Sequence, residues 1–285
     1  MTAMLTRRKL LGTAVAAGAT TLGLGLYGRL WESHWLEFTF LDLPVRGLPA
    51  DLIGARLVQL SDIHVGPRVD DAYIAHAFAQ VTALAPDIVA YTGDFVSIED
   101  RGGDVYAHAE RMYAGAPRGR LATVGITGNH EYGRQWAHPA IADRLSGIFA
   151  ASGIRMLHNQ LVDVAGLQIV GLDDLWGAQF DATAALARFD PGRAGLALSH
   201  NPDTVDLPVW RNFRGWILAG HTHGGQVRPP FLPPPIVPVK NRRYTAGVFA
   251  LTDERTLYVS RGVGHFFQLR INVRPEVPVF TLQRA

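Results

Sequence analysis

Cysteine is absent from this chain of 285 residues, and lysine is nearly absent. Without cysteine, the chain has no disulfide bonds, no thiolate metal ligands and no cysteine nucleophile. The absence is compatible with an oxidising compartment. Only 2 of the 27 basic residues are lysine, which we attribute to genome composition and not to phosphate recognition.

The chain also has little net charge, and what it has lies at one end. The formal charge is +2, but four basic residues (Arg7, Arg8, Lys9 and Arg29) precede the first acidic residue, Glu32. Residues 32–285 carry 23 basic and 25 acidic groups. Because the body is slightly acidic, the pI of about 9.0 comes from the leader, and we expect no nucleic-acid binding.

The first 35 residues are predicted to be a targeting segment. A basic Arg-Arg-Lys cluster precedes residues 10–28, which carry no charge and are rich in Ala, Gly and Leu. The sequence Thr-Arg-Arg-Lys-Leu-Leu at residues 6–11 resembles the twin-arginine export signal. The uncharged stretch is close to the ~20 residues that cross a bilayer as a helix. We therefore expect residues 1–35 to be an uncleaved membrane anchor, with the body outside the cytoplasm; cleavage after a small-residue site and a buried N-terminal helix are the alternatives.

Residues 36–285 are predicted to form one α/β domain, since a hydrophobic content of 48% can bury one large core. Short apolar runs alternate with helical patterns, which is typical of βαβ folds. Strands are expected at 55–60, 87–92, 121–127, 167–172, 195–199 and 215–219. Helices are expected after Asp70 and Asp71, which can cap, and at 104–114, 136–152 and 181–189.

After residue 240 the pattern changes to short strands separated by turn residues, with no helix. Four segments read as strands: YTAGVFAL, TLYVSR, LRINV and VPVFTL. They are expected to extend a second sheet in antiparallel fashion. The proline-dense segment 228–238 is predicted to be a surface loop.

Each of five apolar runs ends in a polar cluster. Ligands bind at the carboxyl ends of strands in α/β sheets, so these clusters are expected to converge. Taken singly, an Asp can cap a helix, an Asn can hold a left-handed turn and a His can be a hydrogen-bonded core residue. Together they supply oxygen and nitrogen donors of the kind that Mn, Fe, Zn or Ni accept. The candidate donors are Asp62, His64, Asp94, Asn129, His200, His221 and His223.

In this order, the motifs D-x-H, G-D, G-N-H-E, a lone His and G-H-x-H resemble the calcineurin-like metallophosphoesterases. The resemblance spans residues 55 to about 282 and includes GHTHGGQVRPP, YVSRGVG and RPE. Within that family the chain looks most like small bacterial phosphohydrolases that are exported by the twin-arginine route or anchored to the membrane. The implied fold is a four-layer αββα sandwich of two mixed sheets flanked by helices.

The resemblance also implies roles for the site residues. Asp62, His64, Asp94 and His223 would hold one divalent ion, and Asp94, Asn129, His200 and His221 the other, with Asp94 bridging. The implied reaction is hydrolysis of a phosphomonoester or phosphodiester by attack of a metal-bridging hydroxide. His130 would stabilise charge or protonate the leaving oxygen. Glu131 is either an orienting partner of His130 or a surface residue.

Other candidates have weaker arguments. The six remaining histidines are expected to be structural, although His265 lies where the family's active-site rim falls. Asp173 and Asp174 end another strand, and three arginines could hold phosphate: Arg68, Arg134 and Arg228. Two segments, PPFLPPPIVP and HFFQLRI, are candidates for an apolar rim and suggest a membrane-proximal, lipid-linked substrate.

Three other functions compete with a phosphoesterase. One is a pyrophosphate hydrolase of the UDP-2,3-diacylglucosamine type, whose cytoplasmic substrate an exported body could not reach. Another is a non-catalytic envelope protein that keeps metals for structure or binding. A mononuclear iron oxygenase fits poorly, since seven candidate donors exceed its three-ligand site.

Overall fold

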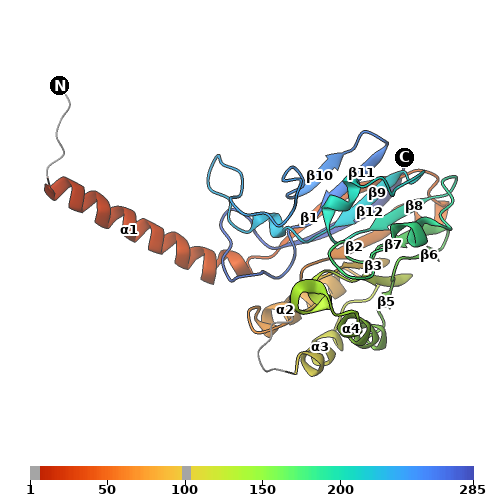
Figure 1. The fold of residues 1–285 in the computed structure, drawn as a ribbon, viewed down its shortest axis with the longest axis horizontal. Coiled ribbons are helices and arrows are strands. Elements are labelled where there is room, and N and C mark those ends of the chain that lie inside the picture. Colours follow the sequence, from red (N-terminus) through yellow and green to blue (C-terminus); the bar gives the residue numbers. More distant parts are fainter. Residues whose placement is uncertain (1–6, 98–103) are drawn as a thin grey trace.

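Two six-stranded sheets packed face to face form the centre of the computed structural model, which describes residues 7–97 and 104–285 (Figure 1). The fold class is therefore the predicted one, two mixed sheets with helices on their outer faces. The N-terminal helix α1 (Arg7–Leu30) projects from one end of this body. The chain then turns through η1 (Glu32–His34) into the first sheet.

The first sheet has the strand order β1-β12-β2-β3-β4-β5. Strands β2 to β5 are parallel, β12 is antiparallel to β2, and β1 is parallel to β12. Parallel neighbours align their carboxyl ends at one edge, which places the loops after β2, β3 and β4 together. The strands are β1 (Glu37–Val45), β2 (Arg56–Leu60), β3 (Ile88–Thr92), β4 (Ala122–Ile126), β5 (Arg155–Met156) and β12 (Glu276–Arg284).

The second sheet has the order β10-β11-β9-β8-β7-β6. Strands β7, β8, β9 and β11 are parallel, and the hairpin partners β6 and β10 are antiparallel at the two edges. The carboxyl ends of β8 and β9 again meet at one edge. The strands are β6 (Gln160–Val164), β7 (Leu167–Gly171), β8 (Gly195–Leu198), β9 (Gly215–Ala219), β10 (Gly247–Ala250) and β11 (Arg255–Val259).

Three apolar clusters bury the faces of these sheets. One lies between the sheets and contains Leu57 and Ile126 of the first with Ile169 and Leu218 of the second. The second cluster packs three helices on the first sheet: α2 (Asp71–Ala83), α3 (Val105–Tyr113) and α4 (Pro139–Ala151). The third lies on the second sheet beneath α5 (Ala182–Leu186), η5 (Pro202–Asp206) and loops, so this outer layer is thinner.

Local sequence explains where the helices begin. The side chain of Asp70 accepts a hydrogen bond from the backbone N–H of Tyr73 at 3.0 Å and caps α2, as predicted. Asp104 and Asp181 cap α3 and α5 in the same way. The remaining short 3-10 turns are η2 (Ala50–Leu52), η3 (His130–Tyr132), η4 (Arg134–Trp136) and η6 (His223–Gly225).

The C-terminal part corrects one prediction. Strands β10 and β11 extend the second sheet, but β11 is parallel to β9, and β12 belongs to the first sheet. The segment LRINV is not a strand: Ile271 makes one isolated bridge with Val227, and Asn272 has a left-handed φ of 56° that ends extended structure.

Helix α1 covers most of the segment in which the sequence predicts an anchor. In residues 7–97 and 104–285, no helix has the length and apolar character that crossing a bilayer requires. The end of α1 contacts the body: Gly28 lies against Leu269 and Ile271, and its carbonyl accepts from the N–H of Arg270 at 3.1 Å.

Candidate metal centre

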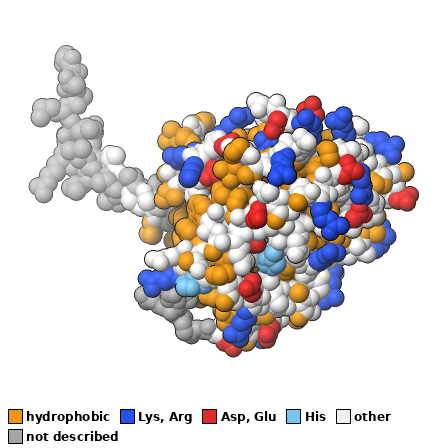
Figure 2. All heavy atoms as spheres, turned by 45° about the vertical axis from the view of Figure 1, so that its right-hand side comes forward, with side chains coloured by type: hydrophobic (Ala, Val, Ile, Leu, Met, Phe, Trp, Pro, Cys, Tyr) orange, Lys and Arg blue, Asp and Glu red, His pale blue; other side chains and the backbone are white. Residues whose placement is uncertain are grey.

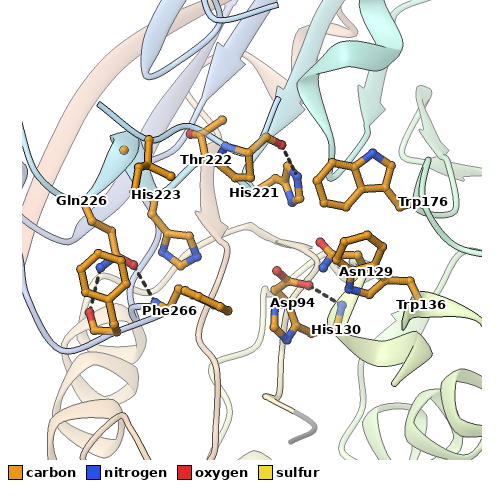
Figure 3. A pocket seen from close by; sticks show the side chains of 14 residues that line it. Asp94, Asn129, His130, Trp136, Trp176, His221, Thr222, His223, Gln226 and Phe266 are labelled. Carbon is orange, nitrogen blue, oxygen red and sulfur yellow. Dashed lines mark hydrogen bonds between the residues drawn. The ribbon is translucent and has the colours of Figure 1, made fainter. Parts of the chain in front are cut away.

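The seven predicted donor residues all lie at the carboxyl ends of strands from the two sheets. Asp62 and His64 follow β2, Asp94 follows β3 and Asn129 follows β4. From the second sheet, His200 follows β8, and His221 and His223 follow β9. Figure 3 shows His221 and His223 facing Asp94, Asn129 and His130 across one pocket. We call these seven residues the floor; none is more than 5% exposed.

The first part of the floor brings together Asp62, His64 and His223. Their donor atoms lie within 4.8 Å of one another, the spacing of a group that could hold an ion. The Nε2 atoms of His64 and His223 are 3.0 Å apart, and Nε2 of His223 is 3.3 Å from Oδ1 of Asp62. Three Lewis bases thus point at one small volume.

The second part contains Asp94, His200 and His221, whose donor atoms also lie within 4.8 Å. Oδ2 of Asp94 is 3.1 Å from Nε2 of His200, and Nδ1 of His221 is 3.3 Å from the same nitrogen. Oδ2 of Asp94 is also 3.7 Å from Nε2 of His64 in the first part. Asp94 therefore stands between the two parts, and His221 and His223 belong to different ones.

Hydrogen bonds outside the floor fix which ring nitrogen faces it. Nε2 of His221 lies 2.9 Å from the carbonyl oxygen of Pro238, and Nδ1 of His200 lies 2.7 Å from that of Thr92. A carbonyl only accepts, so these nitrogens carry protons, and the opposite nitrogen of each ring faces the floor. Nδ1 of His64 pairs with Oγ of Ser97 at 2.9 Å. The three rings are thus oriented with their other nitrogen toward the floor.

The floor suits a metal ion in a further respect. Oδ1 of Asn129 is buried and has no hydrogen-bond partner among the described residues. A buried amide oxygen without a partner costs about 1–3 kcal/mol, which coordination to a cation would recover. Oxygen and nitrogen donors with no thiolate fit Mn, Fe, Zn or Ni.

The backbone of the floor is conformationally strained. Asp62, His64, Asp94, His221 and His223 all have positive φ, between 51° and 71°. A non-glycine residue in the left-handed region costs of order 1 kcal/mol or more, and such residues cluster at functional sites. Five of the seven donors share this conformation, so the surrounding fold holds the side chains in place against a local cost.

Two glycines permit this close packing. A Cβ atom on Gly220 would overlap Oγ of Ser61 and the carboxylate of Asp62, and one on Gly128 would overlap the carboxylate of Asp94. The glycine that opens GHTHGG therefore leaves room for a donor from the other sheet.

Burial and mutual charge set the protonation of the floor. Burial lowers the pKa of His64 and His223 well below the usual value and that of His221 to about 3. These rings are therefore neutral, the form that binds metals. Burial opposes ionisation of Asp94, but the positive charge of His200 outweighs it and holds the pKa of Asp94 well below its usual value. Burial raises the pKa of Asp62.

His130 lies beside the floor and is less buried. Its ring packs edge-on against His64 at 4.7 Å between centroids, and its backbone N–H donates to Oδ1 of Asp94 at 3.0 Å. Its donor atom also lies within 4.8 Å of those of His64 and Asp94. Because it is partly exposed at the pocket, it can reach a bound molecule directly.

Glu131 corrects the prediction that it orients His130 or lies at the surface. It is fully buried, and its carboxylate accepts from the N–H groups of Asp94 (2.9 Å), Gly128 (2.7 Å) and Val96 (3.2 Å). It therefore ties the loop after β3 to the loop after β4. Burial and the charge of Asp94 raise its pKa.

The pocket above the floor has a cavity of about 270 Å³ and apolar walls. Trp136 and Trp176 stand on one flank and Phe266 on the other (Figure 3). The Trp rings are 4.5 Å apart between centroids, and Trp176 packs edge-on against His221 at 4.4 Å. We call the apolar wall residues the rim: Trp136, Trp176, Ile236, Phe266 and Phe267.

Sequence reasoning found only part of the rim. It singled out the segments that contain Ile236, Phe266 and Phe267, but it missed Trp136 and Trp176. Trp136 lies in a loop whose residues Gln135 and Trp136 both have positive φ, so no periodic pattern marks it. The signal that could have identified Trp136 and Trp176 is the residue type, a tryptophan between two of the polar clusters that end strands.

The weaker candidates lie outside the pocket lining. His265 is buried, with Nε2 2.9 Å from the carbonyl of Arg68. Asp173 accepts from the hydroxyls of Thr127 and Tyr132. Asp174 accepts from the N–H of Trp176 at 2.8 Å and so supports the rim. Among the described residues, the lining includes none of the arginines proposed for phosphate: Arg68, Arg134 and Arg228.

Comparisons with known proteins agree with this geometry. Residues 55–225 match the family model for calcineurin-like phosphoesterases. The chain is 32% identical to the uncharacterized metallophosphoesterase YkuE of Bacillus subtilis, over 95% of this chain and 94% of that one. It is 33% identical to the phosphodiesterase YaeI of Escherichia coli, over 98% and 100%. It is 26% identical to the UDP-2,3-diacylglucosamine pyrophosphatase LpxG of Chlamydia muridarum, over 87% and 91%.

Proposed function

Because this chain belongs to the calcineurin-like phosphoesterase family of metal-dependent hydrolases, we propose that its floor is a dinuclear site that hydrolyses phosphomonoesters or phosphodiesters. The observation that carries this proposal is the position of Asp94 between two groups of donors. One group alone would hold one ion, and a carboxylate shared by both groups allows two ions to bind next to each other.

In this proposal, Asp62, His64, Asp94 and His223 hold the first ion. Asp94, Asn129, His200 and His221 hold the second. When bound, two divalent ions neutralise charge on the phosphate and lower the pKa of an attacking water. Only two of the seven donors are carboxylates, so the loaded floor keeps a positive charge that attracts a phosphate anion.

The chain's own residues orient and protonate the substrate. His130 stands at the pocket with its ring beside His64, where it can donate a proton to the leaving oxygen. Pro238 and Thr92 hold the rings of His221 and His200 through their carbonyls, so these rings do not rotate during turnover. The apolar walls exclude water from the rest of the pocket.

We further propose that the substrate is lipid-linked. The support is the apolar rim, which can hold acyl or isoprenoid chains next to the floor, and the similarity to a pyrophosphatase that acts on UDP-2,3-diacylglucosamine. A pyrophosphate hydrolase of that type is therefore the second candidate, and it is an alternative to export, because its substrate is cytoplasmic. A water-filled polar pocket would instead suit a free nucleotide or sugar phosphate.

A turnover screen tests the proposal. The full chain is freed of metal, reloaded with Mn, Fe, Zn or Ni, and assayed on nitrophenyl monoester, nitrophenyl diester, nucleotides and lipid pyrophosphates. Hydrolysis of at least one class with one of these metals is expected. No hydrolysis with any of these metals would contradict the proposed enzymatic function and would favour a non-catalytic metal protein.

We also propose that residues 1–35 direct export of the body by the twin-arginine route. The support is the paired Arg7 and Arg8 before an uncharged stretch. Fractionation of cells that produce the chain with and without R7K/R8K checks this: the wild type should lie outside the cytoplasm and the variant inside. Equal distribution of both would contradict it.

A further inference from the structure

Exposed apolar side chains surround the mouth of the pocket and continue to the end of α1. Phe231 is fully exposed, and Leu232, Leu30 and Trp31 are each at least 60% exposed. Figure 2 shows hydrophobic side chains gathered beside the point where α1 joins the body. We call this surface the apolar shelf: Leu30, Trp31, Phe231, Leu232, Phe266 and Phe267. Contiguous exposed apolar surface of this kind marks an interaction site.

Backbone contacts show that the parts of the shelf adjoin. The carbonyl of Gly28 in α1 accepts from Arg270, and Arg228 donates to the carbonyl of Ile271 at 2.9 Å. The side chain of Gln226 binds the N–H of Phe266 (2.7 Å) and the carbonyl of Phe267 (2.8 Å). The segment from 266 to 272 therefore lies between α1 and the loop from 228 to 238.

The chain segments that carry the shelf have charge of one sign. No acidic residue occurs in residues 13–31, 226–252 or 260–275, whereas residues 32–285 as a whole carry a net negative charge. The same segments contain eight basic residues, of which Arg29, Arg228, Lys240, Arg242 and Arg243 are exposed. Basic groups around an apolar surface are complementary to a bilayer with anionic headgroups.

We propose that the apolar shelf docks this protein on the surface of a membrane that contains anionic lipid. Phe231 and Leu232 enter the boundary between headgroups and acyl chains, and the exposed basic residues face the lipid phosphates. Phe266 and Phe267 belong both to the shelf and to the rim, so docking turns the mouth of the pocket toward the bilayer.

Docking would explain how an apolar substrate reaches a buried floor. A lipid-linked phosphate could slide from the bilayer between Phe266 and Ile236 without its chains crossing water. This part of the inference rests on the proposed function. The docking itself does not, because it depends on exposed side chains that are not floor residues.

Vesicle binding by the full chain tests the proposal. Binding is measured by flotation with phosphatidylcholine vesicles, with and without phosphatidylglycerol, and F231S/L232S is compared with wild type. We expect binding to the anionic vesicles, weakened by roughly tenfold in the variant, because two large apolar side chains no longer enter the lipid. Ile53→Ser is the matched control: Ile53 is 47% exposed and precedes β2 at the opposite end from the floor.

A charge variant tests the electrostatic part. Arg228→Gln should weaken binding to anionic vesicles by about fivefold, and Arg46→Gln, which removes an exposed arginine elsewhere, should not. The difference should disappear at high salt, where surface charges are screened. Equal binding to neutral and anionic vesicles would overturn the electrostatic part.

Hydrolysis of a water-soluble nitrophenyl phosphate keeps the two proposals apart. Phe231 and Leu232 do not line the pocket, so F231S/L232S should retain this activity. A chain that hydrolyses this substrate but binds no vesicles would overturn the docking alone. The wild type could instead bind no vesicles and form a dimer that F231S/L232S converts to a monomer. That result would identify a second copy of the chain as the occupant of the shelf and would also overturn the docking proposal.

Discussion

The floor of the pocket consists of polar donors at most 5% exposed, whereas most of its rim consists of apolar side chains that are 37% exposed or more. Floor residues follow buried strands, and five of seven have positive φ. Rim residues lie on loops and pack on one another. The difference teaches that the two regions have separate tasks. The fold holds the floor residues in strained backbone conformations, so that their donor atoms converge as metal binding requires. The rim contacts the part of the substrate to which the phosphate is attached.

The largest effect is expected from the residue shared by both halves of the floor. Asp94→Asn removes the bridging charge, so the chain should lose both turnover and metal content. Metal analysis and diester hydrolysis on the same sample check this. Full metal content with normal turnover would show that Asp94 is not a ligand shared by two ions, and the floor would then not be distinguished from the rim by metal binding at Asp94.

The next largest effect is expected at the edge of the floor. His130→Ala should lower kcat by about 10²- to 10⁴-fold and leave metal content unchanged, because His130 acts on the leaving group and not on the ions. His138→Ala, an exposed histidine in a nearby loop, is the control. Loss of metal in His130→Ala would instead assign His130 to the ligand set, which its position near His64 and Asp94 permits.

A smaller loss is expected when the support of the floor is changed. Glu131→Gln keeps the shape of the side chain. Its amide NH2 group, however, would face backbone N–H groups that bond to the carboxylate in the wild type. The loop that carries Asp94 should loosen and weaken metal affinity by about 10- to 100-fold. Titration with a fluorescent metal competitor measures this. Unchanged affinity would mean that Asp94 is held in place without Glu131.

Changing the rim should alter substrate preference without altering metal content. Trp136→Ala removes one half of the Trp pair, and KM for a lipid-linked or aryl phosphate should rise about 2- to 10-fold. KM for a small alkyl phosphate should stay constant. Equal changes in KM for both substrates would show that Trp136→Ala disturbs the floor as well as the rim. The two regions would then not have separate tasks.

The last prediction concerns stability and a carboxylate outside the floor that pairs with an arginine. Burial opposes ionisation of Glu276, but hydrogen bonds and charge from Arg261 hold its pKa below the usual 4.5. Its contribution to stability is therefore present above pH 4.5 and lost as the pH falls through the lower, folded-state pKa. Glu276→Gln should lower the free energy of unfolding by about 1.5–3 kcal/mol at pH 7 and less in acid. Urea unfolding at several pH values checks this, and a difference independent of pH would contradict it.

The sequence predicted most of the central strands and all seven floor positions as candidates, because each buried strand is an uninterrupted apolar run that ends in a polar cluster. It missed β1, β5 and β6, and it placed β12 in the wrong sheet, because long-range pairing leaves no local signal. LRINV reads as a strand but is not one: the buried guanidinium of Arg270 binds the carbonyls of Arg261 and Val273 and holds the segment in a loop. Neither the positive φ of the floor nor the Trp136–Trp176 pair could be read from the residues, since both depend on tertiary contacts.

Metal counting on an active sample tests the central claim most directly. The full chain is loaded with each candidate metal, excess metal is removed, and the ions per chain are measured together with hydrolysis of a nitrophenyl diester. About two ions per chain are predicted, with activity that rises as the second ion binds. Full activity at one ion per chain, or two ions per chain with no hydrolysis of any phosphate ester, would contradict the account.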